Sequence, residues 1–184
     1  MIRSVCVFCG ARQGRDPAFA AAAGAFGSAL SARGLRLVYG GGRIGLMGLV
    51  ADAVLAGKGQ VTGVLPRFLA RQEILHAGVQ EHIEVDDLFE RKRVMLARAD
   101  AFVALPGGIG TLDELLEVIA WRQLGQLDCP IGMLNVNAFF EPWLVALRAS
   151  AAAGFISATD IDALAVHASP DGLLDMLLGA EAPT

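Results

Sequence analysis

The stretch "DAFVALPGGIGTLDELLEVIAW", residues 100–121, joins an apolar run to an amphipathic pattern through three closely spaced glycines. The run over 100–106 has the nearly continuous apolar character of a strand that is buried on both faces. After the glycines, apolar residues recur at helical spacing, as at Leu112, Leu115 and Leu116. The stretch therefore predicts a strand, a tight turn and a helix, the repeating unit of an α/β fold.

The same unit recurs along the chain. We expect strands over 2–8, 35–40, 60–66, 79–85, 100–106, 130–136 and 163–167. We expect helices over 16–34, 44–57, 86–99, 138–153 and 170–178, besides the helix in the quoted stretch. The polar stretch 67–78 is expected to be irregular. This order predicts a Rossmann-like doubly wound parallel sheet with helices on both faces, and functional groups in the loops at the carboxyl ends of the strands.

Length and composition favour one globular α/β domain over residues 1–180, with 181–184 as a disordered tail. No apolar run reaches the roughly 18 residues of a membrane span, and Gly10 and Arg12 come too early for a secretory signal. We therefore expect a cytoplasmic protein that does not bind membranes. The net charge is −4 and no block of adjacent basic residues occurs, so nucleic acid is not an expected partner.

The cysteines and histidines show no pattern typical of a metal site. Cys6 and Cys9 form a C-x-x-C pair at the end of a strand, where their odd separation directs the side chains to opposite faces. We interpret them as buried free thiols. His76, His82 and His167 lack metal-ligand spacing, so we expect structural histidines and no metal.

Two glycine-rich loops, "YGGGRIGLMG" (39–48) and "LPGGIGTLDE" (105–114), each follow an expected strand and precede an expected helix. Glycines at such a place let backbone N–H groups and the positive end of a helix approach an anion. One such loop is explained equally well as a simple turn, but two in one sheet favour a phosphate or nucleotide ligand. Neither loop matches the common ATP or dinucleotide signatures.

Thr111 and Glu114 admit a purely structural interpretation. Their spacing, just before an apolar helical stripe, fits a capping box in which Glu114 only satisfies a backbone donor. Arg91 has a similar alternative, as a surface residue paired with Glu90 or Asp87.

The segment "PGGIGTLDE" (106–114) resembles the P-G-G-x-G-T-x-x-E signature of the LOG (Lonely Guy) family. The segments "VFCGAR" (7–12), "YGGGRIGLMG" (39–48), "ERKRVML" (90–96) and "WRQLGQLDCPIGMLNV" (121–136) resemble the family in the same order. The resemblance implies a phosphoribohydrolase that releases the free base from nucleoside 5′-monophosphates such as AMP and cytokinin riboside monophosphates. It implies no cofactor, and it implies a homodimer or a larger homo-oligomer.

The resemblance also implies site residues. The catalytic residues that it implies are Arg91 and Glu114. The sequence leaves open which of the two stabilises the departing base. The residues implied to contact the substrate are Gly41, Gly42, Met95, Gly107, Gly108, Gly110 and Thr111.

The chain departs from the family pattern at two places. It has Cys9-Gly10-Ala11-Arg12 where members often have Cys-Gly-Ser-Ser, so hydroxyl donors are replaced by a cation. It has Leu88-Phe89 before Glu90-Arg91-Lys92 where many members have Met-His, so no histidine role carries over.

Two other functions remain open on the sequence alone. A pyridoxal-phosphate lysine decarboxylase, a label often given to the family, needs a Schiff-base lysine, and only Lys58 and Lys92 are present. A carrier that binds a nucleotide or phosphorylated cofactor without turnover would use the same loops. The physiological base, adenine or a prenylated adenine, is not encoded in any segment that we can interpret.

Overall fold

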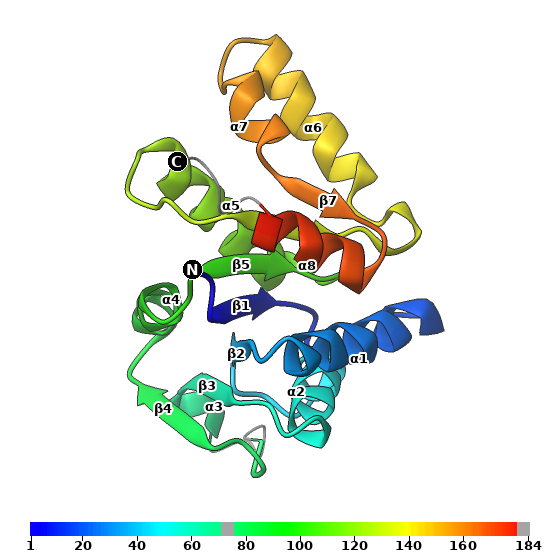
Figure 1. Cartoon of the computed structure of the whole chain (residues 1–184). Coiled ribbons are helices and arrows are strands. Elements are labelled where there is room, and N and C mark those ends of the chain that lie inside the picture. Colours follow the sequence, from blue (N-terminus) through cyan, green and yellow to red (C-terminus); the bar gives the residue numbers. More distant parts are fainter. Residues whose placement is uncertain (71–75, 180–184) are drawn as a thin grey trace.

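The computed structural model describes residues 1–70 and 76–179 of the chain (Figure 1). The strands are β1 (Ser4–Phe8), β2 (Arg36–Tyr39), β3 (Val61–Pro66), β4 (Glu81–Val85), β5 (Ala101–Ala104), β6 (Ile131–Leu134) and β7 (Ala165–His167). The helices are α1 (Pro17–Ala32), α2 (Gly45–Ala56), α3 (Arg67–Ala70), α4 (Leu88–Ala97), α5 (Ile109–Gln123), the 3-10 turn η1 (Val136–Ala138), α6 (Glu141–Ala152), α7 (Ala158–Asp162) and α8 (Pro170–Gly179).

All seven strands of the described chain form one parallel sheet in the order β4-β3-β2-β1-β5-β6-β7. Strands β2, β3 and β4 are added in turn on one side of β1. The next strand, β5, pairs with the other side of β1. The order therefore reverses between β1 and β5, whose ends are level because Phe8 pairs with Ala104. In open parallel sheets, a ligand crevice is expected at the carboxyl ends of the two strands that flank such a reversal.

Two apolar cores cover the two faces of the sheet, which confirms the doubly wound α/β prediction. Residues of α1, α2 and α8, such as Phe26, Val54 and Leu173, pack on one face. Residues of α4, α5, α6 and α7, such as Leu115 and Leu144, pack on the other. Burying one such side chain stabilises the fold by about 1.5–3 kcal/mol, so the sheet is fixed chiefly by these layers.

The first helix begins as its sequence predicts. Asp16 is the N-cap of α1 and accepts a hydrogen bond from the N–H of Ala18, while Pro17 occupies the first turn. The helix ends before Gly34, which has a φ of +68° that favours glycine.

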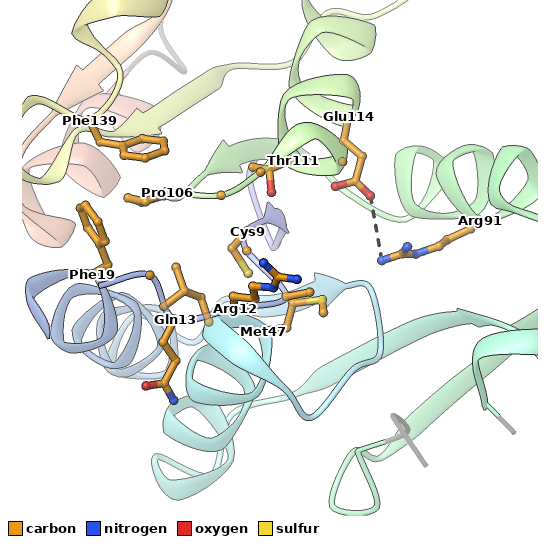
Figure 2. Close-up of a pocket in the computed structure, with 17 residues that line it drawn as sticks. Cys9, Arg12, Gln13, Phe19, Met47, Arg91, Pro106, Thr111, Glu114 and Phe139 are labelled. Carbon is orange, nitrogen blue, oxygen red and sulfur yellow. Dashed lines mark ion pairs between the residues drawn. The ribbon is translucent and has the colours of Figure 1, made fainter. Parts of the chain in front are cut away.

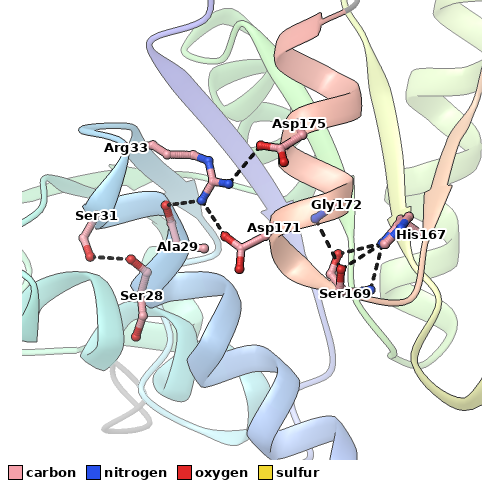
Figure 3. Close-up of polar contacts among 9 residues, drawn as sticks. All are labelled: Ser28, Ala29, Ser31, Arg33, His167, Ser169, Asp171, Gly172 and Asp175. Carbon is pink, nitrogen blue, oxygen red and sulfur yellow. Dashed lines mark hydrogen bonds and ion pairs between the residues drawn. The ribbon is translucent and has the colours of Figure 1, made fainter.

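The last helix is fastened to the first by charged side chains (Figure 3). Arg33, just after α1, contacts the carboxylates of Asp171 and Asp175 on α8 at 2.7 and 2.9 Å. Ser169 accepts a hydrogen bond from the N–H of Gly172 in the first turn of α8. Because the two acids are largely exposed, these ion pairs orient α8 more than they stabilise it.

The structure corrects the element prediction at three places. The stretch 67–78 is not wholly irregular, because it begins with the short helix α3; residues 71–75 lie outside the described residues. The helix predicted over 138–153 begins later, because the 3-10 turn η1 ends at Ala138 and α6 starts at Glu141, and α7 was not predicted. The predicted tail 181–184 also lies outside the described residues. Within 1–70 and 76–179, no helix combines the length and apolar character needed to cross a bilayer.

Candidate active site

A cavity of about 450 Å³ opens where the sheet order reverses, at the carboxyl ends of β1 and β5 (Figure 2). Its walls come from the loops after these strands, from the start of α2 and from α4. Side chains of α1 and of the turn before α6 close one end. The lining residues are Cys9, Gly10, Ala11, Arg12, Gln13, Gly14, Phe19, Leu46, Met47, Arg91, Pro106, Gly107, Gly108, Gly110, Thr111, Glu114 and Phe139.

The glycine loop after β5 ends at the N-terminus of α5 in this cavity. Gly108 is the N-cap, and the first intrahelical bond runs from the N–H of Leu112 to the carbonyl of Gly108. The N–H groups of residues 109–111 therefore precede the hydrogen-bonded ladder of the helix. Gly107 is needed for space, because a β-carbon there would overlap the side chain of buried Thr111. This loop can bind an anion with backbone N–H groups and the helix dipole.

The capping-box interpretation of Glu114 is wrong. Thr111 lies inside α5 and Gly108 caps the helix, so Glu114 has no N-cap partner to complete such a box. A reciprocal cap occurs instead on α4, where Asp87 accepts from the N–H of Glu90 and Glu90 accepts from that of Asp86. The carboxylate of Glu114 lines the cavity and faces α4.

The environment of Glu114 favours its protonated form. The side chain is only 14% exposed, and this burial raises its pKa to about 7, even though Arg91 acts in the opposite direction. A carboxyl group whose pKa lies near neutrality can accept or donate a proton at physiological pH.

Arg91 faces Glu114 across the cavity from the first half of α4 (Figure 2). Its Nη2 lies 4.0 Å from Oε1 of Glu114, which is beyond hydrogen-bonding distance, and its side chain is 15% exposed. Its Nε is buried and has no hydrogen-bond partner within the described chain. The surface alternative for Arg91 is therefore wrong, because the guanidinium is enclosed rather than paired with Glu90 or Asp87. A buried, incompletely bonded guanidinium beside an acid is typical of a ligand-binding site.

Gly40, at the end of β2, provides the space that Arg91 occupies. A β-carbon at position 40 would overlap Nη2 of Arg91, and it would lie 2.9 Å from Cζ and 3.3 Å from Sδ of Met47. The first glycine of the 39–48 loop thus sets the position of the arginine.

Lys92 is directed away from the cavity and ties α4 to α5. Its Nζ contacts Asp113 at 3.1 Å and Glu117 at 2.9 Å. Desolvation lowers the pKa of Lys92, but the two carboxylates outweigh it and raise the pKa overall. A Schiff-base lysine needs the opposite arrangement, with a lowered pKa and an open path to the cavity.

The structure brings six of the nine predicted site residues to the cavity wall. These are Arg91, Gly107, Gly108, Gly110, Thr111 and Glu114. The other three, Gly41, Gly42 and Met95, are buried and do not line it. Gly41 has a φ of +73°, and its carbonyl accepts from the N–H of His76, so it shapes a turn. Met95 packs in the core beneath α4. Substrate contacts by these three remain predictions.

The sequence analysis missed the aromatic end of the cavity. Phe19 from α1 and Phe139 pack edge to face with ring centroids 5.5 Å apart. Phe139 follows Asn137 and Ala138, which have φ values of +49° and +57°, a conformation uncommon for residues other than glycine. Asn137 is held there by its hydrogen bond to Asp16. Tertiary contacts alone create this wall, and no local motif could have revealed it.

The cysteines and histidines have the structural surroundings that were predicted. Cys6 and Cys9 are free thiols that lie in the cores on opposite faces of the sheet, and burial raises both pKa values. His76 donates to Asp52, and His82 donates to the carbonyl of His76. Across residues 1–70 and 76–179, no cluster of three or more His, Cys, Asp or Glu side chains could hold a metal.

The fold and the crevice define the class, a Rossmann-like α/β protein with a cavity at its topological switch point. A family model described as "Possible lysine decarboxylase" matches residues 47–177. The chain is 50% identical, over 84% of its length and 69% of the relative's, to the probable cytokinin riboside 5′-monophosphate phosphoribohydrolase LOGL1 of Oryza sativa subsp. japonica. It is 47% identical, over 85% and 73%, to the cytokinin riboside 5′-monophosphate phosphoribohydrolase LOG3 of Arabidopsis thaliana. The chain therefore belongs to the LOG family.

A more distant likeness concerns the fold alone. The structure of the molybdenum cofactor binding protein from Rippkaea orientalis matches with a TM-score of 0.75 over 99% of both chains, at 17% identity. The same architecture thus occurs in a protein named for binding a cofactor.

Proposed function

We infer that this chain hydrolyses the N-glycosidic bond of purine nucleoside 5′-monophosphates, including cytokinin riboside monophosphates, to the free base and ribose 5-phosphate. Close similarity to LOG enzymes supports the activity. The observation that carries the site assignment is the buried pair of Glu114 and Arg91, 4.0 Å apart, beside the glycine-rich N-terminus of α5.

The chemistry of the bond explains why such a pair is needed. Cleavage places positive charge on the ribose and negative charge on the departing base. The Glu114 carboxylate would stabilise the oxocarbenium-like ribose and orient or deprotonate the attacking water. Arg91 would stabilise the leaving base or hold the sugar phosphate. The incomplete contact between the two side chains leaves their charges available to the substrate.

The phosphate would bind to the backbone of Gly107, Gly108, Gly110 and Thr111. This contact is remote from the bond that breaks, so its binding energy can position the ribose against Glu114. Gly41 and Gly42 also shape the turn that follows Gly40, and Met95 also supports α4, so all three would influence the site in addition to any contact with the substrate.

The structure bears differently on the two alternative functions, lysine decarboxylation and a carrier without turnover. Lysine decarboxylation is not supported, since Lys92 is held in two ion pairs outside the cavity and Lys58 follows α2 in an exposed turn with a φ of +59°. A carrier without turnover would use the same cavity. It does not explain a buried acid whose pKa is raised to near neutrality beside an arginine.

Comparison of nucleotides with nucleosides tests the proposal. We expect release of base from AMP and isopentenyladenosine monophosphate, and kcat/KM at least about 100-fold lower for adenosine, because the glycine loop cannot engage a substrate without phosphate. Chromatographic separation of base from nucleotide gives both rates. Comparable turnover of adenosine and AMP would contradict the assigned role of the loop.

The pH dependence follows from the raised pKa of Glu114. Because the ionised carboxylate is the active form, kcat/KM for AMP should rise with pH and level off above about 7. The second ionisation of the substrate phosphate, near about 6, adds a separate step at lower pH. Initial rates between about pH 5 and pH 9 resolve the two steps, and a flat profile from about pH 6 to pH 8 would rule out Glu114 as the titrating group.

We also propose a homodimer or larger assembly that uses the outer face of α4 and α5. Phe89 is 80% exposed there, and with Trp121 it lines a groove of about 360 Å³. Arg91 and Glu114 lie on the same two helices, so an interface would adjoin the site. Light scattering at micromolar concentration should give at least twice the monomer mass for wild type and a smaller species for Phe89→Lys. Phe155→Lys, at an equally exposed position between α6 and α7, should keep the wild-type mass.

We further propose a cytoplasmic location. The three cysteines are all free, as expected in a reducing compartment.

A further inference from the structure

We propose that Arg12 is a specificity-determining residue that binds the substrate's 5′-phosphate dianion across the cavity from the glycine loop. The proposal rests on the proposed function and assigns a role to a residue at which this chain departs from its family's usual pattern. Arg12 lies in the loop after β1 and lines the same cavity as Gly107, Gly108 and Thr111 (Figure 2).

The loop that carries Arg12 is held firmly against the glycine loop. The N–H of Gly10 donates to the carbonyl of Pro106 at 3.1 Å, and the N–H of Leu46 donates to the carbonyl of Gly10 at 2.9 Å. Gly45, with a φ of +61°, lets the start of α2 approach the backbone of Ala11 closely. Arg12 therefore extends from a fixed backbone whose position is tied to that of the anion-binding helix.

No residue in the described parts of the chain neutralises the charge of Arg12. Its guanidinium has no hydrogen bond or ion pair to any residue in the described parts of the chain. Among the lining residues that belong to 1–70 and 76–179, Glu114 is the only acid, and Arg91 already faces it. The cavity wall thus carries two guanidinium groups and one carboxyl group, an excess of positive charge that suits a phosphate dianion.

An arginine changes how the phosphate is recognised. A serine at position 12 would add one neutral hydroxyl, whereas guanidinium supplies a charged fork that can bind two phosphate oxygens at once. The N–H groups at the start of α5 and Arg12 would then contact the phosphate from opposite walls. Because the reacting bond lies at Glu114, we expect Arg12 to contribute to substrate binding far more than to the chemical step.

Kinetics of Arg12→Ala test this role, with Arg15→Ala as the matched control. Arg15 is exposed in the same loop but does not line the cavity. Loss of charged hydrogen bonds should raise KM for AMP by about 10- to 100-fold, with kcat within about threefold of wild type. Arg12→Lys should recover part of the loss, and added salt should raise KM less in Arg12→Ala than in wild type. An equal effect of Arg15→Ala would overturn the proposal.

Calorimetry with ribose 5-phosphate separates this inference from the proposed function, since it needs no turnover. Wild type should bind ribose 5-phosphate, and Arg12→Ala should bind it about 10- to 100-fold more weakly. Equal binding by both proteins would overturn the role of Arg12 and leave hydrolysis of AMP untouched. Weaker binding by Arg12→Ala without hydrolysis of AMP by wild type would support Arg12 and contradict the enzyme. No binding by wild type would overturn the role of Arg12, and release of adenine from AMP would then decide the proposed function independently.

Discussion

Glu114→Gln is expected to give a folded protein that binds AMP and releases adenine at least about 100-fold more slowly than wild type. The substitution keeps the shape of the side chain and removes the negative charge that would face the ribose. The measurement is kcat for AMP together with the dissociation constant from calorimetry, since the glycine loop that would hold the phosphate is unaltered. Glu117→Gln, one turn further along α5 and outside the cavity, should retain activity within a few-fold.

The same variant should not be less stable than wild type. The folded pKa of Glu114 is raised to about 7, so the protonated side chain stabilises the fold below the unfolded pKa, and this contribution is lost as pH rises through about 7. At about pH 8, ionisation of the buried Glu114 lowers the free energy of unfolding of wild type by about 3 kcal/mol. Glutamine is neutral and avoids this loss. Thermal unfolding at that pH should give an equal or higher Tm for Glu114→Gln. A clear fall in Tm with near-normal turnover would return Glu114 to a structural role and strengthen the carrier hypothesis.

Gly40→Ala should inactivate the protein without contact between residue 40 and the substrate. The added β-carbon would overlap Nη2 of Arg91, and a flexible side chain moves more readily than the strand. We expect a loss of about 100-fold in kcat/KM, the size of effect produced when a reacting group shifts by about 1 Å, with Tm close to wild type. Initial rates with AMP and thermal unfolding measure the two effects.

The matched control is Gly24→Ala. Gly24 lies within α1, and a β-carbon there would meet no atom within 4 Å. Activity should stay at the wild-type level and stability should rise by up to about 1 kcal/mol, because alanine is the better helix former. Wild-type activity in Gly40→Ala would show that the position of Arg91 is not critical.

The sequence allowed the sheet to be predicted because its strands and helix boundaries have local signatures, whereas the roles of Arg91 and Glu114 were predicted from the resemblance to the LOG family. Strands such as β5 are apolar throughout, Asp16 and Pro17 mark the start of α1, and the spacing of the 106–114 segment fixes Thr111 and Glu114 on one helix. Parallel strands bring their carboxyl ends to one edge of the sheet, and the loops at that edge border the cavity.

The remaining features depend on contacts between distant segments. The two glycine loops look alike in sequence, yet only the one after β5 contributes glycines to the cavity wall, since β5 flanks the reversal of strand order and β2 does not. The glycines after β2 instead shape a turn and leave space for Arg91. The wall of Phe19 and Phe139 depends on the left-handed backbone of residues 137 and 138, which no glycine signals.

The central claim is that Glu114 and Arg91 direct water to the ribose carbon rather than to the phosphorus. Quantifying all four possible products of AMP tests it most directly. The account predicts that adenine and ribose 5-phosphate appear in equal amounts, and that both fall together in Glu114→Gln. Formation of adenosine and inorganic phosphate by wild type, or unchanged release of adenine by Glu114→Gln, would contradict the account.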